Sequence, residues 1–283
     1  MRRCEMHLLE AGHCRHPEAL TLAGGRLAPV KFPNLVALLI HPQEGAVVFD
    51  TGYDPAFLDA TDPFPERLYR WLTPPEFTSD EPVQYQLRRH GLSPADVRWV
   101  ILSHFHGDHI AGLKAFARAK IMCSRAGLDA ARAGGAWRAL SAGVLRQLIP
   151  GDMDDRVSFF EDRPGMALPT AFAPFLEGAD VFGDGSVLAT PLPGHCPGHW
   201  GLVLRDQRDA YHFLVADAAW SSRAIREDRA PPRLTTSFLG RTSPYRETLN
   251  KLHSLVRAAP DVVVTPAHCA ERAVEIAAAR ETP

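Results

Sequence analysis

The stretch SHFHGDHIAG, residues 103–112, places His104, His106, Asp108 and His109 within six residues of one another. Each of these side chains can bind a metal ion. In an extended loop, residues two apart project to the same side, so His104 and His106 can hold one ion while the next turn directs Asp108 and His109 at a second. Imidazole nitrogen and carboxylate oxygen suit zinc, iron and manganese alike. The crowding therefore predicts two neighbouring divalent ions.

This loop alone does not complete two coordination shells, and the sequence offers three further candidates. Each lies shortly after an apolar run that predicts a strand, at residues 187–190, 211–216 and 261–265. The candidates are His195, Asp217 and His268. Loops at one edge of packed sheets can converge, and a carboxylate has two oxygens with which it can bridge two ions. We therefore predict one shared metal site.

The remaining patterns predict an α/β protein. Apolar runs near the N-terminus indicate a sheet, residues 82–90 indicate a helix, and a second helix begins at Ser243. We expect one domain over residues 1–283, with irregular insertions near 150–185 and 221–241. Apolar side chains in and beside these insertions are predicted to line a substrate pocket, namely Phe172, Phe175, Phe182, Trp220, Phe238 and Leu239.

Composition narrows the function classes. Lysine plus arginine (31) nearly balances aspartate plus glutamate (33), which argues against a nucleic-acid partner. The longest apolar run, residues 35–40, is far shorter than the roughly 20 residues that a membrane helix needs. Five cysteines without a tight repeat favour free thiols and a cytoplasmic location. Cys196 and Cys269 directly follow His195 and His268. A thiol at either position can compete for a nearby metal, but we expect both to fill space beside these ligands.

The metal motif resembles the signature of the metallo-β-lactamase superfamily, His-x-His-x-Asp-His followed by a later His, Asp and His. The turn VVFDTGY, residues 47–53, is similar to the superfamily's Asp-Thr-Gly turn, where Asp50 would orient a ligating histidine. The resemblance implies an αββα sandwich, two mixed β-sheets flanked by helices, with a dinuclear site along one edge. It assigns one ion to His104, His106 and His195, the other to Asp108, His109 and His268, and the bridge to Asp217.

Within the superfamily, the chain is most similar to the N-acyl homoserine lactone lactonases of the quorum-quenching type. The likeness rests on AGHCRH leading through KFPNLVALLIHPQEG, on PGHCPGH and on DAAW. It implies hydrolysis of a lactone or ester by a metal-bridging hydroxide, with two divalent ions, zinc first and iron or manganese as alternatives. The catalytic candidates are Asp108, Asp217 and Trp220. Trp220 stands where those lactonases carry a carbonyl-binding tyrosine, and Gly107 where they tend to carry a bulky residue.

Three alternatives stay open at this stage. Glyoxalase II-like thioesterases and arylesterases share the PGHxPGH loop, some relatives of the same fold carry iron for redox chemistry, and a regulator can bind a ligand without catalysis. The expected partner is a small-molecule lactone or ester. Related lactonases and thioesterases occur as monomers and as dimers, so a homodimer is also open.

Overall fold

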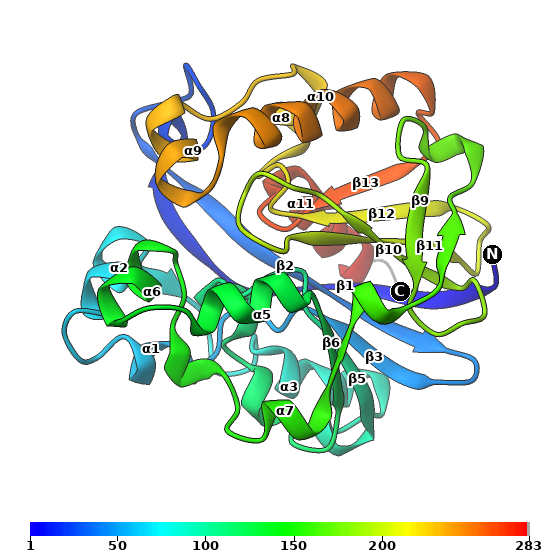
Figure 1. Cartoon of the computed structure of the whole chain (residues 1–283), viewed down its shortest axis with the longest axis horizontal. Coiled ribbons are helices and arrows are strands. Elements are labelled where there is room, and N and C mark those ends of the chain that lie inside the picture. Colours follow the sequence, from blue (N-terminus) through cyan, green and yellow to red (C-terminus); the bar gives the residue numbers. More distant parts are fainter. Residues whose placement is uncertain (282–283) are drawn as a thin grey trace.

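Two β-sheets form the centre of the molecule, and β1 belongs to both of them (Figure 1). A computed structural model describes residues 1–281, with the side chains of residues 237–239 and 279–281 left out. The first sheet comprises β1 (Arg3–Pro17), β2 (Pro29–His41), β3 (Gly45–Phe49), β4 (Pro75–Glu76), β5 (Val97–Ile101), β6 (Lys120–Cys123) and β7 (Val157–Phe159). The second comprises β8 (Gly165–Ala167), β9 (Glu177–Asp180), β10 (Val187–Pro191), β11 (Trp200–Asp206), β12 (Tyr211–Ala216) and β13 (Val263–Pro266).

The strand pairing explains how the sheets are joined. Arg3 and Cys4 of β1 pair in parallel with β11, whereas the rest of β1 pairs in antiparallel with β2. The first sheet then continues through β3, β5, β6 and β7, and the second continues from β11 to β10 on one side and β12 on the other. One long strand therefore fixes the two sheets against each other.

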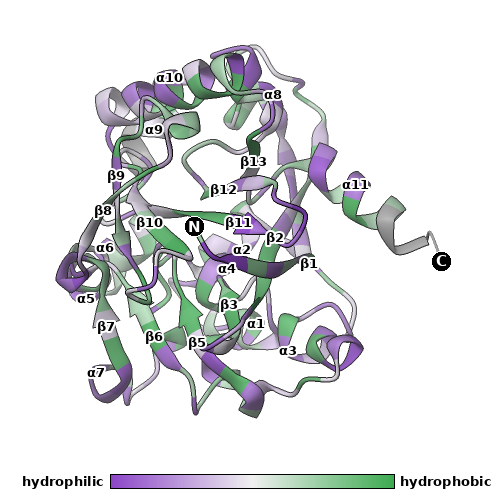
Figure 2. Ribbon diagram, turned by 90° about the vertical axis from the view of Figure 1, so that its right-hand side faces the viewer, coloured by the Kyte–Doolittle hydropathy of each residue, from purple (hydrophilic) through white to green (hydrophobic). Residues whose placement is uncertain are grey.

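Side chains alternate strictly between two apolar layers along the central strands. In β3, Val47 and Phe49 face the layer between the sheets, while Val48 faces the helices on the outer side. In β12, Leu214 and Phe213 divide in the same way. Both faces of these strands are covered, which is why they read as continuous apolar runs in the sequence. Figure 2 shows these hydrophobic strands enclosed by helices with hydrophilic outer sides.

Helices cover the outer face of each sheet, so the predicted αββα sandwich is confirmed (Figure 1). Those associated with the first sheet are α1 (Pro55–Ala60), α2 (Arg67–Leu72), α3 (Val83–Gln86), α4 (Gly107–Ile110), α5 (Arg125–Arg132), α6 (Ala136–Ser141) and α7 (Met153–Arg156). Those that follow β12 are α8 (Ser222–Arg226), α9 (Arg233–Leu239), α10 (Thr242–Ala258) and α11 (Ala270–Glu281). Within the described chain, no helix is both long and apolar enough to cross a bilayer.

Two segments that were predicted to be irregular contain short elements. Residues 150–185 include α7, β7, β8 and β9, and residues 221–241 include α8 and α9. These elements are only three to seven residues long, too short to produce a clear hydrophobic period. The predicted helix from Ser243 corresponds to α10, which begins one residue earlier and buries Leu249 and Leu252 against the second sheet.

Candidate metal centre

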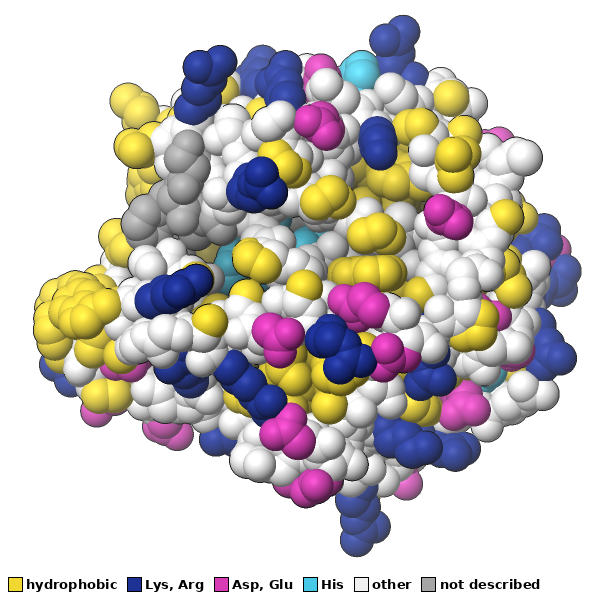
Figure 3. Space-filling model, viewed as in Figure 1, with side chains coloured by type: hydrophobic (Ala, Val, Ile, Leu, Met, Phe, Trp, Pro, Cys, Tyr) yellow, Lys and Arg dark blue, Asp and Glu magenta, His cyan; other side chains and the backbone are white. Residues whose placement is uncertain are grey.

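The predicted ligands meet at one edge of the paired sheets, beyond the carboxyl ends of five strands. The loop after β5 carries residues 103–109, and the loop after β10 carries His195. Asp217 directly follows β12, and His268 stands two residues beyond β13. Asp50, the first residue after β3, lies behind them. Figure 3 shows histidine side chains at the base of an opening on this face of the molecule.

The loop after β5 has the predicted alternating geometry. Phe105 is buried in the core of the first sheet, whereas His104 and His106 on either side of it point into the site. Gly143 makes room for the second of these rings. Its backbone is left-handed, with φ of 69°, and a Cβ there would lie 2.9 Å from Cδ2 of His106. A residue with a side chain would therefore be strained and would also displace the imidazole.

Hydrogen bonds fix the orientation of two site imidazoles through a single carboxylate. Asp50 Oδ2 accepts from His109 Nδ1 at 2.9 Å and from the Ser103 hydroxyl at 2.7 Å. Because the Ser103 proton goes to Asp50, its oxygen accepts from His104 Nδ1 at 2.9 Å. The Nδ1 atoms of both rings therefore carry protons, and their Nε2 lone pairs are free to face the site. Asp50 thus occupies the orienting position that the resemblance implied.

His268 is oriented in the same way from a different strand. Its Nδ1 lies 2.8 Å from the carbonyl oxygen of Pro33 in β2. Because a carbonyl oxygen only accepts hydrogen bonds, Nδ1 carries the proton and donates it to this bond. Its Nε2 then lies 3.4 Å from Asp108 Oδ2 and 3.3 Å from Asp217 Oδ1. A backbone hydrogen bond from Leu35 to Ala267 holds the His268 loop against β2. The site therefore depends on the contact between sheets as well as on each loop.

Several donor atoms of this cluster are buried without a hydrogen-bond partner. These atoms include Nε2 of His104, Nε2 of His109 and Oδ1 of Asp217. Buried polar atoms are normally satisfied, so such a group needs an explanation. Two ligand atoms on one tetrahedral zinc at about 2.0–2.1 Å lie about 3.3 Å apart. The separations here are 2.9 Å for His106 Nδ1 to His195 Nε2 and 3.3 Å for His109 Nε2 to Asp217 Oδ1. The donor set fits divalent cations.

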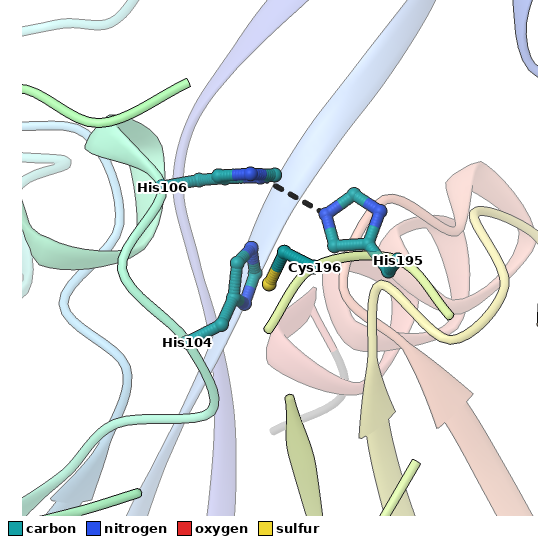
Figure 4. A group of neighbouring side chains, drawn as sticks. All are labelled: His104, His106, His195 and Cys196. Carbon is teal, nitrogen blue, oxygen red and sulfur yellow. Dashed lines mark hydrogen bonds between the residues drawn. The ribbon is translucent and has the colours of Figure 1, made fainter. Parts of the chain in front are cut away.

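The donors divide into two chemically distinct halves. One half, which we call the histidine half, consists of His104, His106, His195 and the neighbouring Cys196 (Figure 4). Burial and the neighbouring imidazoles hold the pKa of His104 well below its usual range, and burial dominates the same lowering for His195. Burial likewise raises the pKa of the Cys196 thiol well above its ordinary value. These groups are therefore neutral at pH 7 while no ion is bound.

The other half, the carboxylate half, consists of Asp108, His109 and His268. Burial alone would lower the pKa of His109, but the carboxylates of Asp217, Asp108 and Asp50 together raise it well above its usual range. The pKa of His268 is raised against burial by the same two site carboxylates, Asp217 and Asp108. These imidazoles attract a proton because the pocket favours positive charge, which is the property that a cation site requires.

Asp217 lies between the two halves. Its Oδ1 is 3.3 Å from Nε2 of both His109 and His268, and its Oδ2 is 3.3 Å from His195 Nε2. Although burial would raise its pKa, the imidazoles of His268, His109 and His195 hold it well below the usual range. Its backbone N–H also donates to His199 Nε2 at 3.1 Å. Asp217 is thus an ionised carboxylate that reaches both halves.

Trp220 contacts this carboxylate. Its indole N–H donates to Asp217 Oδ2 at 2.9 Å, and the residue is buried, with 7% of its surface exposed. The N–H that sequence reasoning offered to a substrate carbonyl therefore has a protein partner. Gly107, the other departure from the lactonase pattern, has no space for a larger residue, since a Cβ there would lie 2.8 Å from Leu145 and 3.1 Å from Phe57.

Two residues near Asp108 were missed by sequence reasoning. The Asn34 side-chain amide donates to the Asp108 backbone carbonyl at 2.9 Å and to its Oδ2 at 3.3 Å, and Asn34 is fully buried. The Tyr69 hydroxyl donates to Asp108 Oδ1 at 3.2 Å. A lone amide inside the apolar run of β2 was a signal that could have identified Asn34. Nothing in the helix RLYRWL distinguishes Tyr69 from an ordinary packing residue.

The predicted apolar pocket is wrong for three of its members. Phe172 and Phe175 pack against Phe213 on the outer face of the second sheet. Phe182 packs against Trp99 and His41. These rings hold their loops to the sheets because large aromatic side chains bury most of their surface where they can. The side chains of Phe238 and Leu239, also predicted for the pocket, lie outside the described residues.

Comparison with known proteins finds one superfamily and, within it, relatives named as N-acyl homoserine lactonases. The profile of the metallo-beta-lactamase superfamily matches residues 33–268. The N-acyl homoserine lactonase AttM of Azorhizobium caulinodans is 27% identical over 271 residues, which cover 94% of this chain and 93% of the relative. An N-acyl homoserine lactonase of Bacillus cereus is 25% identical over 231 residues, covering 80% of each chain.

Solved structures share the fold. An N-acyl homoserine lactone hydrolase with the product N-hexanoyl-L-homoserine bound at its catalytic metal centre superimposes with a TM-score of 0.73. It is 19% identical, and the match covers 97% of each chain. AidC, described as a dizinc quorum-quenching lactonase, superimposes with a TM-score of 0.60 at 16% identity, over 94% of this chain and 88% of AidC. At these identities the likeness describes the architecture alone.

Proposed function

The chain belongs to the metallo-β-lactamase superfamily and is a hydrolase, and from that premise we propose that it opens the lactone ring of N-acyl homoserine lactones. The observation that carries the proposal is the set of buried donor atoms without partners, gathered from separate strand ends into two adjacent groups. Relatives that align over most of the chain are named for this lactone class, and this supports the choice of substrate.

We assign two divalent ions to the site, with zinc as the first choice because three imidazoles and a thiol surround one position. His104, His106 and His195 would hold one ion, and Asp108, His109 and His268 the other. Asp217 reaches both groups. When bound, two such ions make water nucleophilic near neutral pH and polarise an ester carbonyl.

The residues around these donors give the site its shape and its proton path. Trp220 and His199 hold Asp217 at its carboxylate and at its backbone N–H, so that its two oxygens stay directed at both halves. Asn34 and Tyr69 hold Asp108 in the same manner. In the proposed reaction, water adds its oxygen to the carbonyl carbon, and the bond from that carbon to the ring oxygen breaks. Asp108 takes up the proton that the attacking water loses and delivers it to the departing ring oxygen, which gives the open-chain hydroxy acid.

We also place the protein in the cytoplasm, because its five cysteines are all unpaired thiols. Free thiols of this kind persist in a reducing compartment.

The test combines metal analysis with a substrate panel. The purified protein is expected to contain two divalent ions per chain and to hydrolyse N-acyl homoserine lactones faster than simple γ- and δ-lactones, aryl esters or thioesters. Turnover restricted to thioesters would replace the lactonase with a thioesterase. A protein that binds no metal and turns over nothing on the panel would contradict the hydrolytic proposal altogether.

A further inference from the structure

Cys196 lies among the donors of the histidine half. One ligand atom from each of His104, His106, His195 and Cys196 lies within 4.8 Å of all the others in this set. Figure 4 shows the three imidazoles and the thiol directed toward one another from two facing loops. The sequence interpretation of Cys196 as a residue that fills space beside a ligand does not explain why its sulfur faces this group.

A second cysteine in the same sequence context behaves differently. Cys269 follows His268 as Cys196 follows His195, but its sulfur contacts the hydroxyl of Ser222 at 3.1 Å and the backbone N–H of Ser222 at 3.3 Å. Cys269 therefore has a structural partner and belongs to none of the donor groups among the described residues. The sulfur of Cys196 makes no hydrogen bond to any described residue.

An unpartnered nitrogen beside Cys196 independently points to a ligand. His104 is 1% exposed, and its Nε2 is buried without a hydrogen-bond partner. Imidazole and thiolate are both common zinc ligands in proteins, and thiolate favours thiophilic ions over the harder manganese. A coordinating thiol loses its proton outright, whatever its pKa in the metal-free protein.

We propose that Cys196 is a further protein ligand, beside Asp217, of the ion held by His104, His106 and His195. The inference rests on the proposed dinuclear site, and it makes the two metal positions unequal in affinity and selectivity. On binding, the thiol releases its proton to solvent and a metal–sulfur bond forms.

The test uses the full-length protein loaded with cobalt, whose bonds to thiolate give a charge-transfer absorption band in the near ultraviolet. Wild type and Cys269→Ser are expected to show this band, and Cys196→Ser is expected to lose it while folding normally by circular dichroism. In the zinc-loaded wild type, X-ray absorption should detect one sulfur at about 2.3 Å from zinc. Cys196→Ala serves as a second variant if serine disturbs the loop.

Metal competition gives a second readout. Cys196→Ser is expected to lower the preference for cadmium over manganese at the histidine half by at least tenfold, because the soft ligand is gone. Two bound cobalt ions without a sulfur band in wild type, or a band that survives in both Cys196 variants, would overturn the inference and leave the lactonase proposal intact. Failure of the wild type to bind any metal would overturn both proposals.

Discussion

The histidine half and the carboxylate half begin in the same loop, yet they present opposite electrostatics. In the histidine half, burial and neighbouring imidazoles keep His104 and His195 neutral. In the carboxylate half, three acidic side chains raise the pKa of His109. An ion in the first position would be bound mainly by imidazoles that are neutral, whereas an ion in the second would compensate buried negative charge. The comparison teaches that one short motif can serve two different kinds of site.

The two halves share only a few residues, and these decide whether they act as a unit. Asp217 contacts histidines of both halves, and Asp50 orients His109 directly and His104 through Ser103. Substitutions at shared residues should weaken metal binding at both positions. Substitutions at residues that contact only one half should weaken it at that position alone.

The largest effect is expected from Asp217→Ala. Both halves lose a carboxylate oxygen, so we expect fewer than two ions per chain and a fall in kcat/KM of at least about a thousandfold, equivalent to several kcal/mol. Metal content and lactone hydrolysis measure this. Asp206→Ala is the control, because Asp206 also pairs with a histidine, His212, but at the far end of β11. Full activity in the Asp217 variant would exclude its shared role.

Asp50→Asn should have the next largest effect. The amide cannot accept from all three present donors of Asp50, which are the Ser103 hydroxyl, the Ser103 backbone N–H and His109 Nδ1. Loss of such an orienting partner typically costs about 10–100-fold in metal affinity, and we expect this at both positions. Ser103→Ala is the matched comparison and should weaken only the histidine half, through His104. Stepwise titration with zinc resolves the two affinities. Equal effects of both variants at both positions would show that the halves are not separable.

Trp220→Phe should lower kcat by about tenfold, because a hydrogen bond to a buried carboxylate contributes roughly 1.5–3 kcal/mol and part of it is replaced by other contacts. If Trp220 acts through Asp217, every lactone on a panel slows by the same factor. Trp220→Tyr should likewise leave the order of substrates unchanged. A changed ratio between long-chain and short-chain lactones would place the indole on the substrate instead.

Gly143→Ala should have the smallest effect, and it tests the histidine half alone. A left-handed backbone at a non-glycine residue costs about 1–2 kcal/mol. Gly91 is the matched control, because its φ is 70° and a Cβ there would have no atom within 4 Å. We expect similar losses of stability on denaturant unfolding from Gly91→Ala and Gly143→Ala. Only the latter should also weaken metal binding, because its Cβ would press on His106.

The sequence predicted the fold class and pointed to residues that the structure brings together, for identifiable physical reasons. Strands buried on both faces give continuous apolar runs, and each ligand stands just beyond one of them, so position relative to a strand end carried the information. The helices and strands within residues 150–185 are too short to show a hydrophobic periodicity in the sequence. Phe172 and Phe175 were predicted to line a pocket because the sequence of an irregular segment does not show in which direction its aromatic side chains point.

The contacts between side chains were beyond a single sequence. Tyr69 reaches Asp108 from a helix 39 positions away, and Ser103 matters only because it stands between Asp50 and His104. Trp220 was recognised as a site residue, but its hydrogen-bond partner depends on where the ring lies once β12 is in place. The spacing of residues in the chain identifies the candidate metal ligands, whereas only the structure identifies the residues that hold them in place by hydrogen bonds.

The placement of every donor just past a strand end has a consequence for how this protein could change over time. Because the sheets and the residues at their edge supply the proposed reactive centre, the intervening segments, such as residues 150–185 and 221–241, carry none of the assigned ligands. Such segments can be lengthened, shortened or exchanged with those of a relative while the centre keeps its geometry. New substrates are therefore most accessible by loop replacement, with the strands left as they are.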